Sequence, residues 1–97
     1  MVTKLRKTMT AGLREHGLLK ETKPRIDVAF RNHAGDNHPA LIRSLAEIGE
    51  RTGNRDVRRV TSAALADFVA RNEKFMGKKG PNLKPALNIA FKKLRDR

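Results

Sequence analysis

Residues 39–69 read PALIRSLAEIGERTGNRDVRRVTSAALADFV, and this stretch decides the fold. On each side of its central glycine, residues suited to burial recur every three or four positions, which is the spacing of one face of a helix. The stretch therefore predicts two amphipathic helices. The buried face of the first comprises Leu41, Leu45, Ile48 and Thr52, and that of the second comprises Val57, Val60, Ala64, Leu65 and Phe68.

The junction between these two helices is encoded locally. Gly53 suits a left-handed residue just past a helix end, and Asn54 can accept hydrogen bonds from the free amides that open the next helix. Gly49, four positions earlier, would let the two helices cross closely. Two alternatives fit this pattern: a DNA-binding helix–turn–helix and an ordinary αα-hairpin.

The flanking sequence also favours helices. Residues 25–34 are ambiguous because Ile26, Val28 and Phe30 alternate as in a strand, but a helix is preferred since no second strand is available to pair with. We therefore predict an all-α, single-domain bundle of about five helices over residues 1–97. The expected bounds are a basic N-terminal helix at 3–16, a short helix at 23–34, a central helix pair at 39–76 and a basic C-terminal helix at 82–96.

The charge is strongly positive and unevenly distributed. Lys and Arg number 22 against 10 Asp and Glu, which gives a formal net charge of +12. Residues 1–25 carry +5 and residues 78–97 carry +6, whereas residues 26–53 are close to neutral. A positive field of this strength attracts polyanions, of which nucleic acid is the commonest. A basic surface that only aids solubility is the alternative.

The second central helix carries a candidate face for contacting DNA, which we call the reading face. Arg55, Arg59 and Ser62 lie opposite its buried face, with Arg58 beside them, and arginine side chains reach guanine edges or phosphates. A dimer interface through the same face is the alternative, since small residues also permit close helix packing. The predicted nucleic-acid-binding residues are Arg55, Arg58, Arg59, Ser62, Lys78, Lys79, Lys84, Lys92, Lys93, Arg95, Lys4 and Lys7.

No pattern of catalysis is visible in the sequence. The chain has no cysteine, and its histidines, His16, His33 and His38, lack the paired spacing of a zinc site. We therefore expect no enzymatic activity, no cofactor and no bound metal. With no apolar run long enough for a membrane span, the expected location is cytoplasmic, and nucleoid-associated if the protein binds DNA.

These observations lead to two hypotheses of function. The first is a small basic DNA-binding protein, a bacterial or phage regulator or architectural factor, that contacts duplex DNA through the central helix pair and the basic termini. The four phenylalanines all fall on helix faces expected to be buried: Phe30, Phe68, Phe75 and Phe91. This argues against a single-strand binder that stacks nucleobases on aromatic side chains. The second is an antitoxin-like, inhibitor or adaptor module whose basic faces bind an acidic protein partner.

Overall fold

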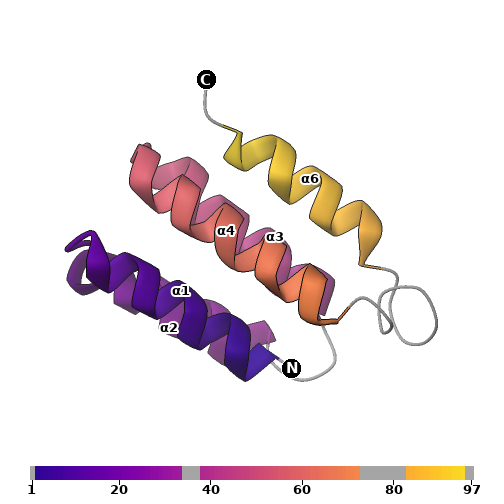
Figure 1. Ribbon diagram of the computed structural model, residues 1–97, viewed down its shortest axis with the longest axis horizontal. Helices are drawn as coiled ribbons and strands as arrows, with labels where there is room; N and C mark the ends of the chain where they lie inside the picture. The colour runs from indigo at the N-terminus through magenta and orange to yellow at the C-terminus, as the bar shows by residue number, and fades with distance from the viewer. Residues whose placement is uncertain (1, 34–37, 73–82, 96–97) are drawn as a thin grey trace.

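The computed structural model describes residues 2–33, 38–72 and 83–95 (Figure 1). Within these ranges there is no strand, so the prediction of an all-α bundle is confirmed, including the helical choice for the ambiguous segment around Ile26. The described helices are α1 (Val2–Glu15), α2 (Leu19–His33), α3 (His38–Thr52), α4 (Arg55–Arg71) and α6 (Lys84–Leu94).

The α3–α4 pair forms the centre of the molecule. Helices α1 and α2 pack on one side of this pair, with α1 against α4 and α2 against α3, while α6 packs on α3 and α4 from the other side. Figure 1 shows α4 lying between α1 and α6. The two helices predicted from residues 39–69 are therefore also the packing centre of the described structure.

The turn between α3 and α4 has the predicted conformation. Gly53 adopts a left-handed backbone with φ of 64°, and the side chain of Asn54 accepts hydrogen bonds from the amides of Asp56 and Val57 at 2.8 and 3.2 Å. After this two-residue link, α4 folds back and lies alongside α3 (Figure 1). The pair is thus arranged as an αα-hairpin.

The core is mainly aliphatic and includes residues from every described helix. Its only buried polar side chains among the described residues are Thr22 and Thr61, whose hydroxyls donate to the carbonyls of Leu18 and Val57 at 2.7 and 2.8 Å. Each hydroxyl is therefore satisfied within its own helix. None of the described helices is long and apolar enough to cross a membrane. The largest fully buried apolar side chains are Leu5, Met9, Leu13, Ile26, Leu41, Ile42, Leu45, Leu65, Leu83 and Val57.

Helix α2 begins earlier than predicted. The sequence pattern placed its start at residue 23, whereas the helix begins at Leu19. Thr22 is buried inside the first turn, where its hydroxyl bonds back to the carbonyl four residues before it. A threonine with that internal bond is compatible with helix, so its capping preference did not set the boundary.

The ends of the last two helices also differ from the prediction. Helix α4 ends at Arg71 instead of continuing to residue 76, because Asn72 caps it through a side-chain hydrogen bond to the carbonyl of Phe68 at 2.8 Å. Helix α6 is preceded by Leu83, which makes no side-chain cap bond. Residues 73–76, the predicted end of the central helix pair, and residue 82, the predicted start of the last helix, lie outside the described residues.

Two glycines mark close approaches between helices. A Cβ atom at Gly49 would lie 2.5 Å from Cδ2 of Leu94 and 3.5 Å from Cα of Arg58. The predicted close crossing at Gly49 therefore exists, but its tightest contact is with α6. A Cβ atom at Gly12 would lie 2.7 Å from Cγ1 of Val60, so a second close crossing joins α1 and α4.

Helices α1 and α2 are joined by an ion-pair cluster centred on Asp27. The carboxylate of Asp27 accepts from Arg6 on α1 and, at 3.1 Å, from Lys23 on α2. The Arg6 guanidinium also lies 5.4 Å from the centroid of the Phe30 ring, within cation–π distance. Hydrogen bonding from Lys23, with a smaller contribution from Arg6, lowers the pKa of Asp27.

Because the folded state depresses this pKa, Asp27 should stabilise the protein above the unfolded pKa and lose that contribution at lower pH. We expect Asp27→Asn to melt at a lower temperature than the parent at neutral pH. The gap should shrink as pH falls below about 4, the usual pKa of aspartate. Thermal melts followed by circular dichroism from pH 7 to pH 3 measure this difference in melting temperature. A difference that stays constant over that range would contradict the prediction.

Candidate nucleic-acid interface

A basic depression lies where α6 meets the end of the α3–α4 hairpin. Its cavity volume is about 670 Å³. It is lined by four basic side chains, one acidic side chain and one apolar side chain. The bases come from two helices that are distant in the sequence. We call this feature the basic depression; its residues are Glu50, Arg58, Ile89, Lys92, Lys93 and Arg95.

Packing explains the position of Arg58 at this site. A Cβ atom at Gly49 would lie 3.4 Å from Cγ of Arg58, so the missing side chain leaves room for the aliphatic stem of the arginine. Arg58 as a whole is half-buried, as is common for arginine next to apolar surface. On the same side, Leu94 fills the space above Gly49 and fixes the last turn of α6.

The remaining bases sit at the end of α6. Lys92 and Lys93 occupy the last turn of the helix, and Arg95 is its C-cap. All three side chains are exposed. Cations at a helix C-terminus also complement its dipole, which contributes about 0.3–1 kcal/mol each, so these residues have a structural role whatever they bind.

Among the described residues, some basic side chains elsewhere in the chain are held in ion pairs, whereas three at the basic depression are not. Arg6 and Lys23 are engaged by Asp27, and Arg71 is held by Asp67 at 2.9 Å. Within the described part of the chain, Lys92, Lys93 and Arg95 form no ion pair. No carboxylate of the described residues is therefore bound to these three side chains, although Glu50 lines the same depression.

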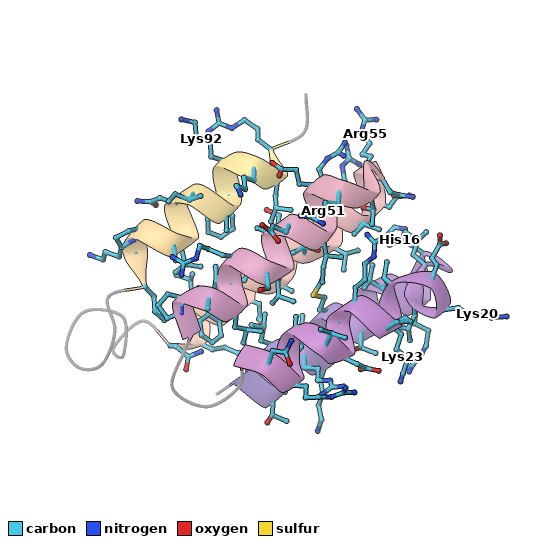
Figure 2. The ribbon with its side chains drawn as sticks, turned by 180° about the vertical axis from the view of Figure 1, so that it is seen from behind. His16, Lys20, Lys23, Arg51, Arg55 and Lys92 are labelled. Carbon is cyan, nitrogen blue, oxygen red and sulfur yellow. The ribbon has the colours of Figure 1, made fainter. Side chains whose placement is uncertain are left out.

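The predicted reading face of α4 is only partly open. Arg55 and Arg59 are exposed, while Ser62 is half-buried. Arg59 borders a different hollow from Arg58, between α4 and α1, beside Glu15 and His16. In Figure 2, Arg55 and Lys92 project outward from the same edge of the molecule, although they belong to different helices.

The other predicted contacts are separated from the basic depression. Lys84 is exposed at the opposite end of α6, nine residues before Lys93, which is about 13 Å along a helix axis. Lys4 and Lys7 are exposed on α1, which packs on the opposite side of the α3–α4 pair from α6. Lys78 and Lys79 lie outside the described residues.

Two further depressions on the other side of α3 contain arginines that the sequence did not single out. Arg25 of α2 and Arg51 of α3 line both of them. Glu21 lines one and Glu47 the other, so over the two depressions together two glutamates balance the two arginines. This region differs in that respect from the basic depression, and we do not include it in the candidate interface.

Ile89 and Glu50 are the residues of the basic depression that the sequence-based prediction missed. Ile89 carried a usable signal, because it is a large apolar residue that lies off the buried face of α6, formed by Ala86, Leu87, Ala90 and Leu94. It is 48% exposed. Glu50 carried none, since an acidic residue near a helix end is common on any surface.

Among the described residues, no group of three or more His, Asp or Glu side chains is placed to hold a metal ion. Comparisons with protein-family models, curated proteins and solved structures found no match to this chain. Function must therefore be inferred from its own charges and geometry.

Proposed function

We propose that this protein binds double-stranded DNA through the phosphate backbone, with Arg58, Lys92, Lys93 and Arg95 as the principal contacts. The observation that carries the proposal is that four basic side chains line one depression. Three of them form no ion pair among the described residues. Lys and Arg side chains are the usual partners of DNA phosphates, and such contacts position a duplex without reading its sequence.

The packing around α4 favours backbone contact over insertion of this helix into a groove. The major groove is about 12 Å wide and admits a single helix, whose own diameter is about 10–12 Å. Helix α4 has α1 on one side and α6 on the other. A duplex approaching its exposed face would meet those neighbours as well, so the fold supports an architectural role or sequence-tolerant regulation.

The placement of the aromatic residues supports a duplex as the ligand. Phe30 and Phe68 are buried and Phe91 is half-buried, and the chain has no tryptophan or tyrosine. Single-stranded binding by stacking requires exposed aromatic faces, which these described residues do not offer. Phosphate contact by lysine and arginine requires only the groups that are present.

Titration of a fluorescent duplex at salt concentrations from 50 to 200 mM tests the proposal. Four phosphate contacts predict that log K falls with log salt with a slope of about −3 to −4. The longest dimension of the protein is 37 Å, which corresponds to about 11 base pairs at 3.4 Å each.

Single-stranded DNA of equal length and polyglutamate serve as the comparison ligands in this titration. A slope near zero would refute binding through the phosphates, and equal affinity for duplex and single strand would refute a duplex as the preferred ligand. Stronger binding to polyglutamate than to duplex would instead support an acidic protein partner.

A further inference from the structure

Ile89 is an exposed apolar side chain within the basic depression. Among the described residues, the large hydrophobic side chains that remain exposed are Ile89 and Val28, each 48% exposed. Val28 lies on α2 in the hollow beside α3, whereas Ile89 lines the same depression as the four bases. An isoleucine in this position is not needed for the core, because the buried face of α6 is formed by other residues.

The chemistry of the DNA backbone gives this residue a partner. Successive phosphates are joined by deoxyribose, whose carbon-bound hydrogens form an apolar surface between two charged groups. Lys92 and Lys93 follow Ile89 by three and four residues on the helix, so all three lie on adjacent turns of one face. A backbone whose phosphates are held by those lysines would bring a sugar against Ile89.

We infer that Ile89 packs against a deoxyribose of the bound duplex and contributes affinity that does not depend on salt. The inference rests on the proposed binding mode and adds an apolar contact to it. Ionic contacts release counterions and so set the slope of log K against log salt, whereas an apolar contact releases none. Removing the Ile89 side chain should therefore lower log K by the same amount at every salt concentration, without changing the slope of log K against log salt.

The test compares Ile89→Ala with the parent protein and with Val28→Ala, which removes an equally exposed side chain from another surface. Covering the exposed half of an isoleucine predicts affinity for a 20-base-pair duplex about 3- to 10-fold lower for Ile89→Ala, at every salt concentration. Val28→Ala should bind as the parent does. Ile89→Leu should retain most of the affinity, since it remains apolar and of similar volume.

The outcomes separate this inference from the proposed function. Equal affinities of Ile89→Ala and Val28→Ala would overturn the sugar contact while a steep salt slope still supported phosphate binding. A loss limited to one duplex sequence would also overturn it, because it would indicate contact with a base edge. If the parent shows no salt-dependent duplex binding, both proposals fail. Melting temperatures of the two alanine variants identify any loss due to unfolding.

Discussion

Replacing Gly12 with leucine is expected to lower the free energy of unfolding by about 1–3 kcal/mol, the usual range for overpacking. Even a Cβ atom at this position would lie 2.7 Å from Cγ1 of Val60. Valine in a helix has one strongly preferred side-chain rotamer, so Val60 has no alternative position of low energy. Helix α1 would have to move away from α4. Urea denaturation followed by circular dichroism measures the change.

Two comparisons identify the cause of that loss. Ala11→Leu places the same side chain at an exposed neighbouring position and should leave stability nearly unchanged, within about 0.5 kcal/mol. Combining Gly12→Leu with Val60→Ala should cost less than the sum of the two single changes, because the second removes the methyl groups that the first displaces. If the two costs simply add, the crossing at Gly12 is not the source of the instability.

The second large effect concerns binding. Changing both Lys92 and Lys93 to glutamate should weaken duplex binding by about 100-fold or more at low salt, since each charged hydrogen bond contributes about 1.5–3 kcal/mol. The magnitude of the salt slope should fall by about two, one for each lost phosphate contact. Both side chains are exposed, so the variant should fold.

Changing Lys4 and Lys7 to glutamate provides the matched control, because the net charge changes equally on a different helix. We expect this variant to lose much less affinity and to keep most of its salt slope. Similar losses in the two variants would mean that only total charge matters and that the basic depression has no special role. The stability of the α6 variant should be measured in parallel, since reversing charges at a helix C-terminus costs about 0.3–1 kcal/mol each.

The features of the fold that depend on local sequence were predictable. The hairpin turn follows from Gly53 and Asn54, whose backbone and capping preferences act over a few residues. The start of α2 was not predictable in the same way, because Thr22 can cap a helix or bond inside one, and burial against neighbouring elements decided between them.

The candidate site depends on contacts between distant residues, so the sequence could only supply its members. Arg58 and Lys92 were both candidates, but nothing in their order along the chain indicates that they line one depression while Lys4 does not. The crossing at Gly12 is similar, because its partner Val60 is far along the chain. The spacing of apolar residues in α6 places Ile89 off the buried face, so the sequence did contain a signal for it. The prediction missed Ile89 because it selected contact residues mainly by their charge.

Helix α6 holds most of the proposed contacts and packs principally on α3 and α4, with no comparable interface to α1 or α2. A local opening that releases α6 would therefore leave the remaining helix contacts in place, at a smaller cost than global unfolding. A duplex held by Lys92, Lys93 and the hairpin residue Arg58 requires α6 to be docked. Binding and docking are then thermodynamically linked, so the ligand would act as a clamp on the C-terminal helix.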